Sequence, residues 1–256
     1  MLTARPALLA STLRHCGAAL VDLVFPPVCL ACRRAVETHG ALCPACWGRM
    51  RFIERPFCER LGLPFAQDLG AEGLLSPEAI ANPPVYTRAR AAVCFEDGPA
   101  RSLVHRLKYH DRMEVAGPMG RWMARAGAEL LTEADCLAPV PLHRSRLFAR
   151  RFNQAAALAQ AVSRQCGAPV EALALVRKKR TSPQVGLSKS QRALNLQGAF
   201  AVPEDMRARI AGKRVVLVDD VITTGATANA AARALRRAGA GNVDVLAFAR
   251  VVAGGL

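Results

Sequence analysis

The sequence predicts an α/β fold, in which a parallel sheet with helices on its faces follows a small cysteine-rich module. Apolar runs of strand character alternate with segments of helical periodicity from about residue 85 onward, the pattern of a parallel sheet with crossover helices. The run Val215–Val218 ends at two aspartates, as expected of a central parallel strand. Two Cys-x2-Cys pairs lie well before this region. Together these observations predict the fold class.

The expected elements follow from the periodicity of the apolar residues. The sequence predicts strands over 91–96, 136–140, 214–218 and 243–251, and helices over 99–109, 114–131, 152–165 and 227–238. The predicted organisation is a leader helix over 1–25, a zinc-ribbon module over 26–64, a linker over 65–84 and the α/β domain over 85–256. The linker is rich in Gly, Pro and Ala and is expected to hold little structure.

The leader predicts a short amphipathic helix and no membrane span. Its apolar stretch is interrupted by Arg14, His15 and Asp22, and it is too short to cross a bilayer. We therefore expect a cytoplasmic protein, with binding of the leader to a membrane surface as the alternative.

Four of the nine cysteines form the pattern Cys29-x2-Cys32-x10-Cys43-x2-Cys46. In a reducing compartment such paired spacings favour a metal over disulfides, and two Cys-x2-Cys turns close a tetrahedral Zn²⁺ site. A redox dithiol, or a chance pairing of motifs, is the alternative. Four protein ligands leave no open position, so the predicted zinc is structural. Cys58 begins a third such turn that Leu61 leaves incomplete.

The net charge of +15 is concentrated in one stretch. Residues 139–192 hold eleven Lys and Arg side chains and a single acid, Glu171. This balance favours anionic partners such as phosphates or nucleic acid, although a basic solvated face is the simpler interpretation.

The segment from Val215 to Thr227 carries the strongest functional signal. A buried strand ends at Asp219 and Asp220, a short loop of Thr and Gly follows, and a helix begins. The N-terminus of a helix presents free N–H groups to a phosphate, and paired carboxylates suit the vicinal hydroxyls of a ribose. The loop thus predicts a cradle for ribose 5-phosphate, whereas an ordinary helix cap would need only one of these residues.

This loop resembles the phosphoribosyl pyrophosphate signature of type I phosphoribosyltransferases, and the whole chain resembles the ComF family. The other segments that carry the resemblance occur in the family's order. They are the cysteine module, the Leu107-Lys108-Tyr109 helix end, Pro139-Val140-Pro141 leading to Arg151-Phe152-Asn153-Gln154, and Thr181 to Phe200. Arg151 departs from the pattern, because family members often have a glycine there.

The resemblance implies roles for particular residues. Asp219 and Asp220 would hold the ribose hydroxyls, while Thr223, Thr224, Gly225, Ala226 and Thr227 would surround the 5-phosphate. The pyrophosphate would lie near Arg144, Arg146, Arg150 and Arg151, accompanied by Mg²⁺. A flap over the site would contain Lys189 or Arg192.

The resemblance implies an enzyme that displaces pyrophosphate from C1 of phosphoribosyl pyrophosphate with a nitrogen nucleophile. The alternative is a non-catalytic protein that binds single-stranded DNA and works with the DNA-uptake machinery of natural competence, with Phe148, Phe152 and Trp122 as the nearest aromatic residues for base stacking. A regulatory phosphoribosyl pyrophosphate sensor is a third interpretation.

Overall fold

The computed structural model describes residues 22, 25–67, 70, 73–108, 110–179 and 196–252. The predicted leader helix, apart from Asp22 and Phe25, and the predicted flap with Lys189 and Arg192 lie outside these residues. Within them, no helix combines the length and the apolar character needed to cross a membrane.

A four-stranded parallel sheet forms the centre of the molecule, in the order β1-β6-β5-β2. The strands are β1 (Ala89–Cys94), β2 (Cys136–Pro139), β5 (Arg214–Ile222) and β6 (Asn242–Arg250). The register pairs Val218 of β5 with Leu246 of β6, and all four strands run in the same direction. The predicted parallel sheet with crossover helices is confirmed.

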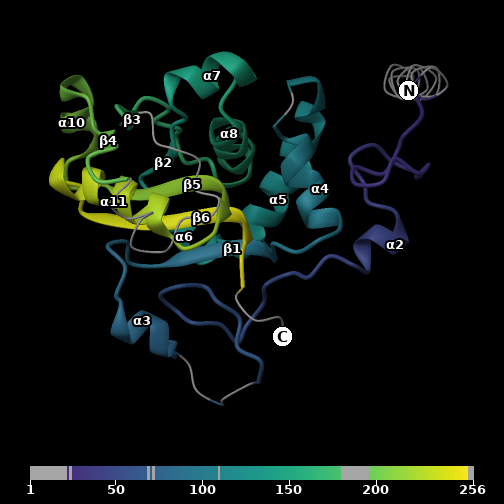
Figure 1. Ribbon diagram of the computed structural model, residues 1–256, viewed down its shortest axis with the longest axis horizontal. Helices are drawn as coiled ribbons and strands as arrows, with labels where there is room; N and C mark the ends of the chain where they lie inside the picture. Colours follow the sequence, from purple (N-terminus) through teal and green to yellow (C-terminus); the bar gives the residue numbers. More distant parts are fainter. Residues whose placement is uncertain are drawn as a thin grey trace, which may run out of the picture.

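Helices cover both faces of this sheet (Figure 1). One face packs against α4 (Pro99–Arg106), α5 (Ala116–Ala126) and α8 (Gln154–Cys166). The other face packs against α10 (Glu204–Ile210) and α11 (Ala226–Arg237). The shorter elements are α2 (Pro44–Trp47), α3 (Pro77–Ala81), the 3-10 helix η1 (His110–Val115), α6 (Ala128–Leu131), α7 (Arg144–Arg150), and the antiparallel pair β3 (Val176–Arg177) and β4 (Phe200–Ala201).

The N-terminal module continues the sheet beyond its edge strand β1. The N–H of Ile53 donates to the carbonyl of Ala92, and the N–H of Cys94 donates to the carbonyl of Arg51, so residues 51–53 pair antiparallel to β1. Figure 1 shows this part of the chain running along the outer side of β1 from α2 towards α3. The segment satisfies backbone groups that an edge strand would otherwise leave open.

The structure differs from the expected elements in four places. β5 does not end at Val218 but continues to Ile222, because its backbone pairing with β6 extends past both aspartates. The helix expected over 114–131 is divided into η1, α5 and α6, with Gly127 ending α5. The predicted linker contains α3, which Ser76 caps at its N-terminus. The segment after β2, expected as a loop, contains α7.

Candidate functional site

The aspartate pair and the Thr/Gly turn lie where β5 passes into α11. Asp219 and Asp220 are in the last part of β5, each accepting a hydrogen bond from the next backbone N–H at 2.9 and 2.8 Å. Gly225 caps α11 with φ of 75°, a left-handed conformation that suits glycine. Because no side chain caps this helix, its first N–H groups face outward from the carboxyl end of the sheet, where ligands bind in open α/β folds.

The two carboxylates are too close together to ionise independently. Desolvation by the surrounding protein, followed by the charge of Asp220, raises the pKa of Asp219 well above its ordinary value, and the guanidinium of Arg177 opposes this only in part. A site of this kind favours a ligand that donates hydrogen bonds to the carboxylates. Vicinal ribose hydroxyls are such donors.

Several buried polar atoms at this end of the sheet have no hydrogen-bond partner. They are Oγ1 of Thr224 after β5, Nε2 of Gln154 after β2, and Nε and Nη1 of Arg250 at the end of β6. Buried polar groups are nearly always satisfied in folded proteins, so each exception calls for an explanation. Their position at the carboxyl ends of three neighbouring strands indicates a place where a ligand supplies the partners.

The sequence interpretation missed Tyr86 and Arg250. The phenol of Tyr86 is buried, and its oxygen lies 3.3 Å from where a Cβ on Gly225 would be. Burial raises the pKa of Tyr86, and a hydrogen bond from Arg250 opposes that rise. Asn229 of α11 also joins this region, since its side-chain oxygen accepts from the N–H of Val85 at 2.7 Å. The available signal is Arg250 itself, a charge that follows the apolar run Val245–Ala249 at the end of the strand.

The basic segment after β2 is only partly gathered toward the site. Arg144 is exposed on α7, whereas Arg150 donates to Oε1 of Gln154 at 3.0 Å. Arg151 follows α7 with φ of 63°. This left-handed conformation explains why a glycine is expected there, and why an arginine at that position carries backbone strain of roughly 1 kcal/mol. The side chain of Arg146 lies outside the described part of the structure.

Asn153 ties this segment to the sheet. Its Oδ1 accepts from the N–H of Ala155 at 3.1 Å and caps α8, while its Nδ2 donates to the carbonyl of Val140 at 3.1 Å. The Asn-Gln pair therefore has divided roles, in which Asn153 closes the loop and Gln154 leaves a buried N–H group facing the site.

Two cavities lie near the features discussed so far. One of about 440 Å³ runs along α11 and reaches Thr224, Asn229 and Arg233. The other, of about 390 Å³, lies between the N-terminal module and α5, away from the loop. Trp122 packs there against Trp47, with ring centroids 6.1 Å apart. Of the predicted stacking residues, Phe148 on α7 is 89% exposed, so it is more accessible than Trp122.

The predicted metal ligands come together. One sulfur atom from each of Cys29, Cys32, Cys43 and Cys46 lies within 4.8 Å of the others. Burial raises the pKa of Cys29, but backbone N–H groups from Cys32, Cys43 and Ala31 outweigh it and lower that pKa to about 6. Four thiols with this spacing and a thiolate-favouring environment fit a closed structural Zn²⁺ site.

A second region of the module has the same layout without the ligands. Cys58 and Leu61 stand at Cys-x2-Cys spacing, as do Ser76 and Ala79, and all four are buried. Ser76 precedes the proline that starts α3, just as Cys43 precedes the proline that starts α2. The sulfur of Cys58 accepts from the N–H groups of Ser76 at 3.2 Å and Leu61 at 3.5 Å. One thiol, one hydroxyl and two hydrocarbon side chains do not fit a zinc site.

Comparisons with known families match both parts of the chain. The model of the double zinc ribbon domain matches residues 20–78, and the model of the phosphoribosyl transferase domain matches residues 153–254. The first ribbon therefore has the residues for structural zinc. The second region within this range has Cys58, Leu61, Ser76 and Ala79 at Cys-x2-Cys spacings, so it has a single thiol, to which backbone N–H groups donate.

Curated relatives cover most of the chain. The DNA utilization protein YhgH of Escherichia coli (strain K12) is 30% identical over 237 residues, which is 90% of this chain and 100% of the relative. Competence protein F of Haemophilus influenzae is 33% identical over 157 residues, which is 59% of this chain and 68% of the relative. A solved glutamine phosphoribosylpyrophosphate amidotransferase from B. subtilis is 24% identical, with a TM-score of 0.35, over 56% of this chain and 30% of that one. This partial structural likeness supports no inference about function.

Proposed function

The chain belongs to the ComF family, and on that premise we propose that it binds phosphoribosyl pyrophosphate or a nucleotide 5′-phosphate at the carboxyl end of its sheet. The observation that carries the proposal is the group of unpartnered buried atoms around Thr224, together with the carboxylate pair at the end of β5. A ribose phosphate would supply hydroxyl donors to the carboxylates and phosphate oxygens to the N–H and O–H groups.

Each part of the loop then has a task. The first N–H groups of α11 would bind the 5-phosphate, and Gly225 would allow the phosphate close to the backbone. Asp219 and Asp220 would orient the ribose by its two hydroxyls. Mg²⁺, when bound, would neutralise charge on the pyrophosphate, near Arg144 and the flap segment.

Transfer of phosphoribose to a nitrogen acceptor is the reaction that follows from this arrangement. The protein residues would hold C1 of the ribose open to attack and stabilise the departing pyrophosphate, so positioning and charge would supply most of the rate. The described residues around the loop do not identify the acceptor. The binding step is therefore the part of the proposal to test first.

Calorimetric titration of the zinc-loaded protein with phosphoribosyl pyrophosphate, with and without Mg²⁺, tests it. We expect saturable, Mg²⁺-dependent binding that ribose 5-phosphate competes away. Asp219→Ala combined with Asp220→Ala should abolish binding, whereas Glu133→Ala, which removes a carboxylate at the opposite end of the sheet, should not. Equal binding by the double variant and the parent would refute the assignment of the loop.

A second function has its own support. We propose that the exposed basic helix α7 contacts single-stranded DNA, in keeping with the names of the relatives, a DNA utilization protein and a competence protein. Arg144 and the 89% exposed ring of Phe148 lie on this helix and would contact phosphates and a base, respectively. A role in DNA uptake follows from this proposal.

Fluorescence anisotropy with a labelled oligonucleotide over a salt series tests the second function. Arg144→Ala should weaken binding and reduce the slope of log affinity against log salt by about one. Phe148→Ala should weaken binding with little change in slope, because stacking releases no counterions. Affinity that is independent of salt would exclude this interpretation. Competition by phosphoribosyl pyrophosphate would place both ligands on one surface.

A further inference from the structure

Arg250 is a buried charge that the proposed site has not yet used. It is the last residue of β6 and is only 4% exposed. Its register partners are Ile222 of β5 and Cys94 of β1, and both belong to the core cluster that contains Tyr86. The guanidinium is therefore held at the carboxyl end of the two central strands, beside the residue at which β5 enters the phosphate loop.

In the part of the chain that the structure describes, Arg250 lacks the ion pair that usually accompanies a buried guanidinium. Its guanidinium hydrogen-bonds the phenol of Tyr86, while Nε and Nη1 have no partner. Among the described residues no ion pair includes it. A buried charge without a counter-charge costs several kcal/mol of folding free energy. A folded protein therefore retains such a charge only where another interaction offsets this cost.

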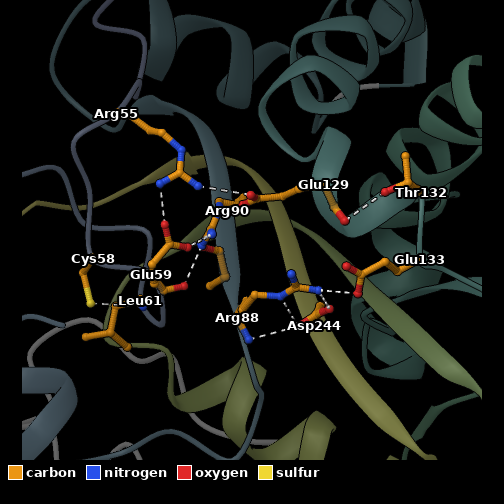
Figure 2. Close-up of polar contacts among 11 residues, drawn as sticks. Arg55, Cys58, Glu59, Leu61, Arg88, Arg90, Glu129, Thr132, Glu133 and Asp244 are labelled. Carbon is orange, nitrogen blue, oxygen red and sulfur yellow. Dashed lines mark hydrogen bonds and ion pairs between the residues drawn. The ribbon is translucent and has the colours of Figure 1, made fainter. Parts of the chain in front are cut away.

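A second buried arginine shows how this chain treats a purely structural charge. Arg90 of β1 is 2% exposed, and it forms ion pairs with Glu59 and Glu129. It also donates to the carbonyls of Glu59 at 2.7 Å and Ala89 at 2.9 Å. Figure 2 shows the two carboxylates converging on its guanidinium. Arg90 and Arg250 are similarly buried, yet of these two arginines only Arg90 forms ion pairs among the described residues.

Tyr86 connects Arg250 to the phosphate loop. The phenol oxygen lies 3.3 Å from the position that a Cβ on Gly225 would take. Gly225 is the residue whose left-handed backbone begins α11 and exposes the first N–H groups of that helix. The guanidinium of Arg250 thus contacts the phenol of Tyr86, which in turn lies against Gly225 of the phosphate loop, and all three are on one face of the sheet.

We propose that Arg250 is a positioning residue of the phosphate site, and that it supplies the buried counter-charge for a phosphate monoester bound at the N-terminus of α11. It holds the Tyr86 phenol against Gly225, which fixes the loop in its binding conformation. Its positive charge is balanced only when the dianion arrives. This inference rests on the proposed binding of ribose 5-phosphate groups, and it assigns the recognition of their phosphate monoester in part to Arg250.

The proposal separates stability from binding in a way that a structural role does not. Replacing Arg250 by methionine removes an uncompensated charge, so the ligand-free protein should be at least as stable as the parent. The same replacement of Arg90 leaves two carboxylates without their partner, so that variant should melt at a clearly lower temperature. Only the first variant should lose the ligand.

The experiment measures melting temperature and ligand affinity for the parent, Arg250→Met, Arg250→Lys, Tyr86→Phe and Arg90→Met. The probes are ribose 5-phosphate, which carries the monoester, and inorganic pyrophosphate, which should bind at the neighbouring arginines. Arg250→Met should weaken ribose 5-phosphate binding roughly 10- to 100-fold, the loss of an interaction with a charged group. Pyrophosphate binding should be unchanged. Arg250→Lys should restore part of the lost affinity, and Tyr86→Phe should give an intermediate loss.

The outcomes distinguish the two proposals. If the parent does not bind ribose 5-phosphate, the proposed function and the role of Arg250 both fail. If the parent binds and a folded Arg250→Met variant binds equally well, only the role of Arg250 fails. A lower melting temperature together with equal losses for both probes would make Arg250 a structural residue and overturn the proposal.

Discussion

The two ends of the parallel sheet treat buried polar groups in opposite ways. At the amino end, Asp244 accepts from the backbone N–H and Nη2 of Arg88, both at 3.0 Å, and Arg88 and Arg214 share Glu133. Figure 2 shows Arg88, Asp244 and Glu133 beside the Arg90 cluster. At the carboxyl end, Thr224 and Arg250 keep buried atoms without partners.

This difference separates the polar groups that the fold satisfies from those that it leaves without partners, and the proposed function assigns the second kind to a ligand. Folding satisfies buried polar groups wherever it can, because an unpaired one costs about 1–3 kcal/mol. The amino end has reached that state with protein groups alone. The carboxyl end has not, and this is the end at which the proposed phosphate loop lies. An uncompensated cluster is thus a better marker of the site than charge itself, which both ends share.

The N-terminal module repeats the contrast on a smaller scale. The first ribbon brings four thiols within 4.8 Å of one another, an arrangement that fits a metal ion. In the second ribbon the N–H groups of Leu61 and Ser76 donate hydrogen bonds to the sulfur of Cys58, so this thiol already has partners. Burial raises the pKa of Cys58, but hydrogen bonds from Ser76, Leu61 and Arg60 outweigh burial and lower it.

The largest effect is expected on removing the metal from the first ribbon. Structural zinc contributes on the order of 10 kcal/mol of binding free energy, so Cys43→Ser should abolish zinc binding and unfold this module. Elemental analysis should find one zinc per parent chain, none in Cys43→Ser and one in the control Cys58→Ala. The triple variant Leu61→Cys, Ser76→Cys, Ala79→Cys should gain a second zinc. Two zinc ions in the parent would contradict the distinction between the ribbons.

The amino end of the sheet should show the next largest effect. Arg90→Met leaves Glu59 and Glu129 without their partner, which should lower the free energy of unfolding by about 3–5 kcal/mol. Urea unfolding measures this loss. Arg125→Met is the matched control, because its pair with Glu54 is exposed and should be worth less than about 1 kcal/mol. Similar losses in the two variants would remove the contrast between buried and exposed pairs.

Removing the charge of Asp219 should have the opposite effect, an increase in the free energy of unfolding. Because its pKa is raised in the folded state, its contribution to stability is fully present below the unfolded pKa and is lost as pH rises through the folded value. Asp219→Asn should therefore stabilise the ligand-free protein by about 1 kcal/mol at neutral pH and remove ribose 5-phosphate binding. Unfolding between acidic and neutral pH measures the change, with the exposed Asp97→Asn as control. A destabilised Asp219→Asn protein would contradict this interpretation.

Glu133 should show the smallest effect, although it makes two ion pairs. A hydrogen bond from Arg88 lowers its pKa, so its contribution is present above the unfolded pKa and is lost as pH falls through the folded value. Glu133→Gln should cause a small loss of stability at neutral pH that high salt removes, because the carboxylate is exposed. In this variant Arg88 still forms its ion pair with Asp244. A loss as large as that of Arg90→Met would show that exposure does not weaken the pairs at this end.

Much of this organisation was predictable because it is local in the chain. The strand before Asp219, the turn at Gly225 and the helix that follows are consecutive, and the spacing of the four cysteines is characteristic of a zinc ribbon. Even the incomplete turn at Cys58 is visible in the sequence. The left-handed backbone at Arg151 could be anticipated only as a departure from the family pattern.

The remaining features depend on residues that are distant in the sequence. The residues between Cys58 and Ser76 carry no motif. Only the folded contact between Cys58 and Ser76 therefore relates Ser76 and Ala79 to the incomplete turn at Cys58. Arg250 and Tyr86 are separated by most of the domain, and β6 brings the arginine to the phosphate loop. Arg90 and Arg250 have the same side chain in similar apolar strands, so their sequence contexts do not reveal which one is compensated.

By itself, the sequence determined the fold class and the first metal site, and it predicted the loop of the proposed phosphate site, because each follows from hydrophobic periodicity or from ligands spaced closely along the chain. Only the tertiary structure decided which polar groups are satisfied. The partner of a buried charge is whatever the packing of strands and helices brings within about 3 Å of it, and that contact is set by the whole fold.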